Sequence, residues 1–471
     1  MNSRTGTANA KRPVHHTLAD DRMEVFADMA KFVTCAQARL HRYEDVGEAA
    51  EAFDEVLEMA VRSSKPGYVS LPSDMVELPV RAEMLDRPLR VEKPLFPWLT
   101  EDAVLEIVLE KLRVARRPLV IADGLCYPFQ FCEEVNAFVT LTGIPAMSFT
   151  SGKGVVDETL PSWDGALPNT TQHSQEADLV LFFGPLLSDT NTARWSAIPE
   201  AGGNTIMFNL DSVEIAGQHI EKVSSKILLQ RIISRLRDEN PFKGRQMHKS
   251  TPPAPSRTSP DPTGPIRQDD LWPAFNPFLR ENDTLLFANG TPLIGARAMT
   301  LPPKTQVIAS PIWNAIGSML PFAQGLAAAK RDHELPVRTI LFEGDGSFQV
   351  TCQAISDIIR YRLDVTVFVA NNGGYTYERW LHGMRAEYND VPGWRYSEAG
   401  RFFGGSEERH SGYPVLGRRV ETWSQLQQVL REENVGDGRG LKIVEIMLDP
   451  EDVPEKAKAG LKRASEALRS G

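Results

Sequence analysis

One stretch, residues 338–374, constrains the fold of this chain more than any other. The apolar run 338–342 leads into the turn 344–346, which reads Gly-Asp-Gly, and a second apolar run, 365–370, ends at the pair 371–372, which reads Asn-Asn. Between the runs, apolar residues recur at the spacing of a helix. A strand, a helix and a strand in this order predict two parallel strands, with both polar turns at the carboxyl edge of one sheet, where open α/β folds bind ligands.

The residue types at these turns suit a ligand that is anionic and bound to a metal ion. Asp345 offers a carboxylate and Asn372 an amide oxygen, which are oxygen ligands of the kind that Mg²⁺ prefers. Gly344 and Gly346 let the backbone approach a bulky anion, and the N–H groups of the helix that begins near Ser347 would point at it. A turn with glycines and a polar strand end would explain either motif alone, but not their order, gap and strand context together.

The two motifs and the residues around them resemble the thiamine-diphosphate fingerprint. Residues 344–383 read GDGSFQVTCQAISDIIRYRLDVTVFVANNGGYTYERWLHG and are similar to the 2-oxo acid decarboxylase branch, close to fungal pyruvate decarboxylases. The resemblance implies a lyase that uses thiamine diphosphate and Mg²⁺ to convert a 2-oxo acid, pyruvate by default, into an aldehyde and CO₂ without oxidation. It also implies a homo-oligomer, a dimer or a homotetramer.

The composition is that of a globular protein with more than one domain. The chain has 471 residues and a net charge of −10, which disfavours nucleic acid or an anionic membrane as a main partner. We find no apolar stretch long enough to span a bilayer and no secretory start. The four cysteines form no metal-binding CxxC pair, so we expect reduced thiols in a cytoplasmic protein.

Helical and strand patterns alternate along most of the chain, which predicts an α/β fold with tandem doubly wound parallel-sheet domains. A helical pattern runs from residue 23 to residue 61, and 66–72 read as a short strand. Further strands are expected at 119–122, 179–183, 206–210, 285–288, 306–309, 339–342, 365–370 and 443–448. The expected parts are a remnant of an N-terminal pyrimidine-binding domain (1–77), a linker (78–99), a middle α/β domain (100–240), a proline-rich linker (241–268), a domain that binds thiamine diphosphate and Mg²⁺ (269–454) and a C-terminal tail (455–471).

The resemblance implies which residues hold the metal ion and the diphosphate. Asp345, Asn372 and the backbone carbonyl of Gly374 would bind Mg²⁺, which would bridge the diphosphate. Octahedral coordination by hard oxygen atoms is the geometry expected of such a site. Backbone and hydroxyl groups of the first motif would contact the diphosphate, and they belong to Gly344, Gly346 and Ser347.

A second turn resembles the ETGT sequence of the family. In residues 288–291, Thr291 matches this pattern and would contact the cofactor, whereas Ala288 and Asn289 depart from it. Tyr377 stands where the family usually has an aliphatic residue in the substrate pocket. These departures leave room for an aromatic or longer 2-oxo acid as the substrate.

Residues 310–317 match a stretch of the family that reads like WGSIG. By this resemblance Ile316 would wedge between the two rings of the cofactor and bend it, which brings its reacting groups together. Asn314 replaces the glycine whose carbonyl accepts from the 4′-amino group of the cofactor. Ordinary packing of an apolar helix start would also favour an isoleucine at position 316.

Three residues are candidates for proton transfer. Glu378 occupies the catalytic glutamate of the family's GYTxE sequence, where partial burial beside the cofactor would raise its pKa. His15 and His16 match the HHTL segment, whose histidines relay protons. The alternatives are a glutamate at an exposed helix start and a polar beginning of the chain.

The resemblance also implies that most of the pyrimidine-binding domain, with the glutamate that activates the cofactor, would lie before Met1. One alternative is therefore a catalytically impaired or non-catalytic homologue that acts as a partner or regulatory subunit of a full-length decarboxylase. Another is a carboligase of the acetolactate-synthase type, which the HHTL segment and Glu378 disfavour.

Overall fold

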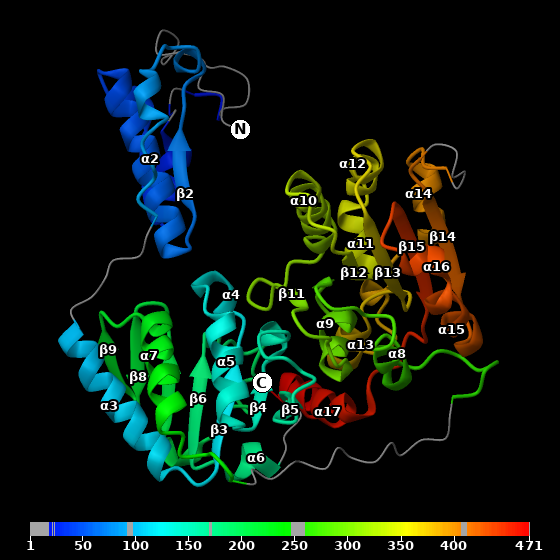
Figure 1. Cartoon of the computed structure of the whole chain (residues 1–471). Helices are drawn as coiled ribbons and strands as arrows, with labels where there is room; N and C mark the ends of the chain where they lie inside the picture. The colour runs from blue at the N-terminus through cyan, green and yellow to red at the C-terminus, as the bar shows by residue number, and fades with distance from the viewer. Residues whose placement is uncertain are drawn as a thin grey trace. The chain divides into compact units, whose positions relative to one another are not determined.

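The computed structural model divides into two compact units, Met1–Phe96 and Pro97–Gly471 (Figure 1). Of the helices in the described part of the chain, none combines the length and the apolar character needed to cross a bilayer. All four cysteines are free, and Cys126 is buried. The structure describes residues 18–20, 22, 24–91, 98–168, 172–245, 260–406 and 412–470.

The first unit is built on a parallel pair of strands, β1 (Ala36–Arg39) and β2 (Gly67–Ser70), connected through α2 (Val46–Ser63). Asp45 caps α2 by accepting hydrogen bonds from the N–H groups of its first turn. The expectation of continuous helix from residue 23 to residue 61 is wrong, because β1 pairs with β2 although its residues do not favour strands. The other elements are α1 (Val25–Ala30) and the 3₁₀ turns η2 (Leu40–Arg42), η3 (Ser73–Met75) and η4 (Ala82–Met84).

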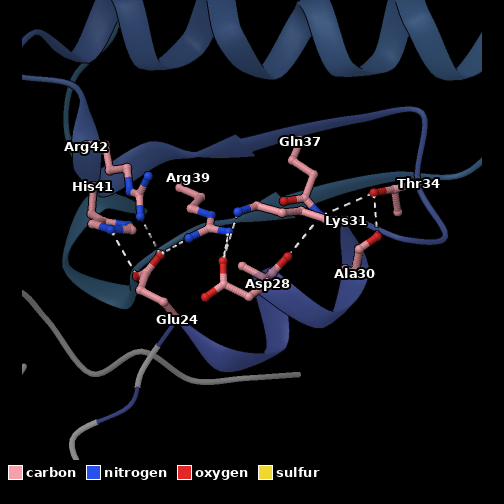
Figure 2. Close-up of polar contacts among 10 residues, drawn as sticks. Glu24, Asp28, Ala30, Lys31, Thr34, Gln37, Arg39, His41 and Arg42 are labelled. Carbon is pink, nitrogen blue, oxygen red and sulfur yellow. Dashed lines mark hydrogen bonds and ion pairs between the residues drawn. The ribbon is translucent and has the colours of Figure 1, made fainter.

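A buried arginine joins β1 to the segment before it. Figure 2 shows Arg39 between Glu24 and Asp28, with Nη1 2.7 Å from Oε2 of Glu24 and Nη2 2.6 Å from Oδ1 of Asp28. The Glu24 carboxylate also contacts Arg42 and His41. Because Arg39 is buried, these charges hold α1 and the end of β1 together more tightly than an exposed pair would.

The second unit contains two sheets, and the first of them, which we call the middle sheet, has seven strands in the order β5-β4-β3-β6-β7-β8-β9. Its strands from β5 to β7 are parallel, whereas β8 and β9 are antiparallel additions that the sequence analysis did not predict. The helix α7 packs against α5 and α3 (Figure 1). The elements are β3 (Pro118–Ala122), β4 (Ala146–Ser148), β5 (Trp163–Ala166), β6 (Leu179–Phe183), β7 (Thr205–Phe208), β8 (Ser212–Ile215), β9 (Gln218–Glu221), α3 (Trp98–Val114), α4 (Cys126–Phe129), α5 (Cys132–Thr142), α6 (Gln172–Glu176), α7 (Ser225–Asp238), η5 (Thr150–Gly152) and η6 (Ala201–Gly203).

The other sheet, which we call the C-terminal sheet, has six parallel strands in the order β11-β10-β12-β13-β15-β14. Its central strands are buried throughout, and a separate apolar core covers each of its faces. The strands are β10 (Thr284–Phe287), β11 (Gln306–Ile308), β12 (Thr339–Gly344), β13 (Val365–Asn371), β14 (Val415–Val420) and β15 (Leu441–Met447). The helices are α8 (Gln268–Ala274), α9 (Thr291–Gly295), α10 (Met319–Asp332), α11 (Asp345–Thr351), α12 (Ala354–Arg360), α13 (Thr376–His382), α14 (Ala399–Phe402), α15 (Trp423–Arg431), α16 (Glu433–Gly436), α17 (Glu455–Ser470), η7 (Ala296–Ala298), η8 (Glu387–Asn389) and η9 (Tyr396–Glu398).

Both sheets reverse their strand order at an interior point. The chain runs outward from β3 to β5 on one side and from β6 to β7 on the other, so the reversal lies between β3 and β6. In the C-terminal sheet the reversal lies between β10 and β12. Ligands of open α/β folds bind at such a point, outside the carboxyl ends of the strands. Every strand that the sequence predicted in the second unit overlaps an observed strand.

Candidate active site

The candidate site lies at the carboxyl edge of the C-terminal sheet, where β10, β12 and β13 end next to one another. Asp345 follows β12, Asn372 follows β13, and Thr291 begins α9 shortly after β10. Nδ2 of Asn372 donates to the Thr291 hydroxyl at 3.3 Å, and the N–H of Gly374 donates to Oδ2 of Asp345 at 2.9 Å. The structure therefore brings the three proposed metal-binding residues and Thr291 into one place.

Asp345 is a buried carboxylate that is held by backbone N–H groups. Oδ1 accepts from the N–H of Gly346 at 2.7 Å and Oδ2 from that of Gly374. Burial raises the pKa of Asp345 to about 6, although hydrogen bonds from the backbone and the charge of Arg379 oppose the rise. A carboxylate that has lost its water is well suited to a divalent cation, because the cation would replace the lost solvation.

Arg379, which the sequence analysis did not single out, shapes the loop after β13. Its guanidinium donates to the carbonyl of Asn372 at 3.2 Å and to the carbonyl of Gly373 at 2.6 Å. Gly374 has a φ of 134°, and a Cβ atom there would lie 2.2 Å from the carbonyl oxygen of Asn389. Only glycine fits this position. An arginine in the last turn of a short helix looks like a surface residue, so the sequence carried little signal for this role.

Glu378 lies close to the same turn, although it is exposed. A Cβ atom on Gly346 would lie 2.7 Å from the ring of Tyr375, which therefore covers this glycine. Burial raises the pKa of Tyr375, and the charges of Asp345 and Glu378 raise it further. Glu378 is exposed in the chain by itself, and its partial burial beside the cofactor stays a prediction. Along α13 its neighbours take the inward positions, so the helical period turns Glu378 outward.

The loop 310–317 presents its apolar side chains to the outside. Trp313 is 86% exposed and Ile316 is 39% exposed. Asn314 has a φ of 48°, in the left-handed region that asparagine tolerates better than most residues, so it keeps a backbone conformation that glycine would favour. The hydroxyl of Thr190 donates to the carbonyl of Pro311, which fixes the beginning of the loop to the middle sheet.

The hydroxyl of Ser347 is hydrogen-bonded within the chain. Its Oγ accepts from the N–H of Gly317 at 2.8 Å. The expected contact between this hydroxyl and the diphosphate stays a prediction, since the hydroxyl can still donate its proton.

Two buried polar groups near this edge lack partners. Neither Oδ1 nor Nδ2 of Asn289 has a hydrogen-bond partner among the described residues, and the same holds for the hydroxyl of Tyr377. An unpaired buried amide costs free energy, so a site that keeps one suits a polar ligand. Asn289 lies two residues before Thr291. The polar groups after β10, β12 and β13 therefore fit a cofactor that contacts the ends of all three strands. His15 and His16 lie outside the described residues, and no cluster of three or more His, Cys, Asp or Glu side chains suited to a metal occurs within them.

Two family models match the second unit. The thiamine pyrophosphate enzyme central domain matches residues 105–232, and the thiamine pyrophosphate enzyme C-terminal TPP binding domain matches residues 290–445. The second match contains Thr291, Asp345, Asn372 and Gly374. It identifies thiamine diphosphate as the cofactor of this class of domain.

Solved structures with this fold include two decarboxylases. Benzoylformate decarboxylase from Polynucleobacter necessarius superimposes with a TM-score of 0.72 at 18% identity. The thiamine diphosphate-dependent 4-hydroxybenzoylformate decarboxylase of Rhodococcus jostii RHA1 superimposes with a TM-score of 0.74 at 16% identity. Each alignment covers 96% of this chain and 82% of the other.

Curated relatives are similar over nearly the whole chain. Pyruvate decarboxylase of Aspergillus parasiticus is 34% identical over 466 residues, which covers 94% of this chain and 77% of the relative. Pyruvate decarboxylase of Kluyveromyces lactis is 31% identical with the same coverage, and isozyme 1 of Saccharomyces cerevisiae is 29% identical over 95% of this chain and 79% of its own length. The chain belongs to the thiamine-diphosphate-dependent 2-oxo acid decarboxylases, the carboxy-lyases that include the pyruvate decarboxylases.

Proposed function

We propose that this protein decarboxylates a 2-oxo acid, with pyruvate as the default substrate, to an aldehyde and CO₂, and that it uses Mg²⁺ with thiamine diphosphate. The observation that supports the proposal most directly is the joining of Asp345, Asn372 and Thr291 at the point where the strand order reverses. The names of the Aspergillus parasiticus and Kluyveromyces lactis relatives support pyruvate as the substrate.

In this proposal Asp345, Asn372 and the carbonyl of Gly374 hold Mg²⁺. Arg379 supports these proposed metal ligands because it donates to the carbonyls of Asn372 and Gly373, and so restrains the loop that follows β13. Gly346 leaves room for the diphosphate, since a larger side chain there would collide with Tyr375, and a Cβ atom on Gly344 would meet open space. The N–H of Gly346 and the hydroxyl of Ser347 would donate to the diphosphate.

Thiamine diphosphate, when bound, supplies the electron sink that accepts the charge left as CO₂ departs. The chain's own residues orient and enclose it. Thr291 and the buried amide of Asn289 would meet its polar groups, while Asn314 and Ile316 on the exposed loop 310–317 would support its rings. An exposed aliphatic side chain gains most from such a contact, because binding would remove it from water.

Glu378 and the histidines His15 and His16 would move protons at the reacting carbon. The position of Glu378 beside Tyr375 places its carboxylate near the turn that holds Asp345. Tyr377 is buried at the position where the family usually has an aliphatic pocket residue, so an aromatic or longer 2-oxo acid is the alternative substrate. We propose the same domain limits that the sequence suggests, a cytoplasmic location, and a dimer or homotetramer of this chain or its association with a full-length homologue.

The test is to measure Mg²⁺-dependent binding of thiamine diphosphate and CO₂ release from pyruvate, with the chain alone and mixed with the Aspergillus parasiticus enzyme. Acetaldehyde as the product supports the proposal, whereas acetolactate without acetaldehyde would replace it with a carboligase. Binding without turnover in either mixture would indicate a non-catalytic partner subunit. The variant D345N serves as the control, because it removes the proposed metal ligand and should abolish binding.

A further inference from the structure

Thr190 forms a contact between the middle sheet and the loop 310–317. It lies in the segment that follows β6, and its hydroxyl donates to the carbonyl of Pro311, at the beginning of the loop. Thr190 is exposed, whereas Pro311 is buried. The same carbonyl also accepts from Nδ2 of Asn314 at 3.5 Å. One backbone carbonyl is therefore held both by the loop itself and by a residue that belongs to the other sheet.

The direction of the Thr190 hydroxyl is set by its neighbours. Oγ of Ser188 lies 3.1 Å from Oγ1 of Thr190 and accepts from the N–H of Asn191 at 3.1 Å. Because the single proton of the Thr190 hydroxyl goes to the carbonyl of Pro311, Ser188 is the donor of this pair. The amide of Asn191 donates to both oxygens of Asp123 at 3.0 Å, and both side chains are buried. A series of hydrogen bonds therefore connects a buried carboxylate to the loop.

The other end of the loop is held by α11. The N–H of Gly317 donates to Oγ of Ser347 at 2.8 Å, and its carbonyl accepts from the hydroxyl of Thr351 at 2.6 Å. Gly317 has a φ of 80°, and a Cβ atom there would lie 2.6 Å from the side chain of Val350. The glycine therefore lies directly against the helix. Because α11 begins at Asp345, this anchor places the loop beside the candidate site.

The middle of the loop is exposed, although both of its ends are buried. Pro311 and Gly317 are buried, whereas Trp313 is 86% exposed and Ile316 is 39% exposed. Exposed apolar side chains gain little from packing against the rest of the chain. The direction in which the loop presents them therefore depends on its two anchors.

The residues around Asp123 contact the C-terminal sheet at a second point. Nε of Arg297 donates to Oγ1 of Thr150 at 2.6 Å, and the next residue, Ser151, donates to Asp123 at 2.5 Å. Arg297 lies in η7, directly after the helix α9 that begins at Thr291. Two segments next to the candidate site are therefore connected to the same buried carboxylate of the middle sheet.

We infer that Thr190 is a positioning residue, through which the hydrogen bonds around Asp123 hold Pro311 and so fix the direction of the loop 310–317 beside the candidate site. The inference rests on the proposed function only where it assigns this loop to the cofactor. The hydrogen bonds themselves are a property of the chain without ligand.

The test compares T190V, which keeps the shape of the side chain but lacks the hydroxyl, with T190S, which keeps the hydroxyl. Hydrogen–deuterium exchange is measured in the chain without cofactor at Asn314, whose N–H donates to the carbonyl of Ser310 at 3.2 Å within the loop. We expect T190V to speed this exchange about three- to tenfold, the factor that corresponds to one lost hydrogen bond. T190S should exchange like the wild type.

T140V is the matched control for T190V. Thr140 is also an exposed threonine of the middle domain, but its hydroxyl donates to the carbonyl of Asn136 at 2.8 Å within α5. T140V should leave exchange of the loop unchanged. A residue that only stabilises the fold would lower the urea midpoint and speed exchange throughout the unit, whereas we expect T190V to keep the midpoint of the wild type, because its side chain is exposed.

The variant S188A tests the hydrogen bonds behind Thr190. Because Ser188 acts through Thr190 in this inference, S188A should speed exchange at Asn314 less than T190V does. The double variant S188A/T190V should exchange no faster than T190V alone. Additive effects of the two changes would overturn the connection between Asp123 and the loop.

Unchanged exchange at Asn314 in T190V, or exchange in T190S as fast as in T190V, would overturn the inference. The affinity for thiamine diphosphate with Mg²⁺ is measured separately and should fall by a similar factor in T190V, because the loop is no longer preorganised. Faster exchange with an unchanged affinity would overturn the assignment of the loop to the cofactor. Faster exchange in a chain that never binds thiamine diphosphate would support the positioning of the loop while contradicting the proposed function, so the two failures are distinguishable.

Discussion

The two sheets of the second unit end in the same kind of residue at the same topological point, yet the two edges differ. Asp123 follows β3 where the middle sheet reverses its order, and Asp345 follows β12 where the C-terminal sheet does so. Both carboxyl groups are buried, and burial raises the pKa of each to about 6. The difference lies in what surrounds them.

We call the carboxyl edge of the middle sheet the closed edge, because its polar side chains hydrogen-bond to other groups of the chain. The carboxylate of Asp123 accepts from the hydroxyl of Ser151 at 2.5 Å, from the amide of Asn191 at 3.0 Å and from the N–H of Leu186 at 2.6 Å, and Gly124 adds a fourth donor. Each oxygen is bound to neighbours in the chain. This hydrogen-bond network connects the loops that follow β3, β4 and β6 to one another.

The edge of the C-terminal sheet is open. Asp345 is held by backbone N–H groups alone, and the nearby amide of Asn289 has no partner among the described residues. The same type of sheet edge can therefore carry either an internal hydrogen-bond network or a candidate ligand site. A few side chains at the strand ends make the difference.

The largest expected effect concerns the buried ion pair between Lys153 and Glu158, which also hydrogen-bonds to the backbone of residues 299 and 301. Nζ of Lys153 lies 2.9 Å from Glu158 and donates to the carbonyl of Met299, while Glu158 accepts from the N–H of Leu301. Both side chains are fully buried. Lys153→Met leaves an unpaired buried carboxylate and should lower the free energy of unfolding by about 3–5 kcal/mol. Urea unfolding followed by circular dichroism measures this, and K153M/E158L, which removes both charges, should recover most of the loss.

Exchanging each aspartate for asparagine contrasts the two edges directly. Asp345→Asn should weaken Mg²⁺-dependent binding of thiamine diphosphate by about 100-fold or more, because a metal ligand loses its charge. Asp123→Asn should instead lower the free energy of unfolding by about 1–3 kcal/mol, because its amide would face the donors of Leu186 and Gly124. Calorimetric titration and urea unfolding of both variants measure the two effects. Equal effects of the two variants on binding would contradict the contrast.

A pair of asparagines provides a finer comparison. Asn191→Ala removes the hydrogen bonds that the Asn191 amide donates to both oxygens of Asp123 and to the Leu186 carbonyl, and should cost about 1–3 kcal/mol of stability. Asn289→Ala removes an amide that has no partner among the described residues, so it should leave stability unchanged or raise it. Thermal unfolding without ligand compares the two. A large loss in Asn289→Ala would show that this amide is engaged in the free protein.

The smallest effect is a pH dependence that belongs to Asp123. Folding raises its pKa from 3.8 to about 6, so the folded chain holds the proton more tightly than the unfolded chain. The stability from this group is present below pH 3.8 and is lost as the pH rises through about 6. The advantage of the wild type over Asp123→Asn should shrink by about 1 kcal/mol between roughly pH 5 and pH 7, as measured by urea unfolding. An advantage that grows with pH would contradict this.

Much of the fold followed from local patterns. The buried strands around Leu181 and Phe342 have continuous apolar runs that end in turns, and they were found where they were expected. The residues 36–39 were expected to be helical, because their pairing with β2 depends on residues about thirty positions away. The hairpin of β8 and β9 was missed for a related reason, since its outer strand is largely exposed and has no apolar run.

Local residue types and spacing were enough to predict most strands of the second unit, the cofactor family and the candidate residues Asp345, Asn372 and Gly374. How the polar groups of the site share their hydrogen bonds depended on the three-dimensional fold. There the N–H of Gly317 donates to the hydroxyl of Ser347, Glu378 faces outward, and Arg379 binds carbonyls of the loop after β13. Hydrogen bonds of this kind join residues that are distant in sequence, and their partners are known only once the strands lie next to one another.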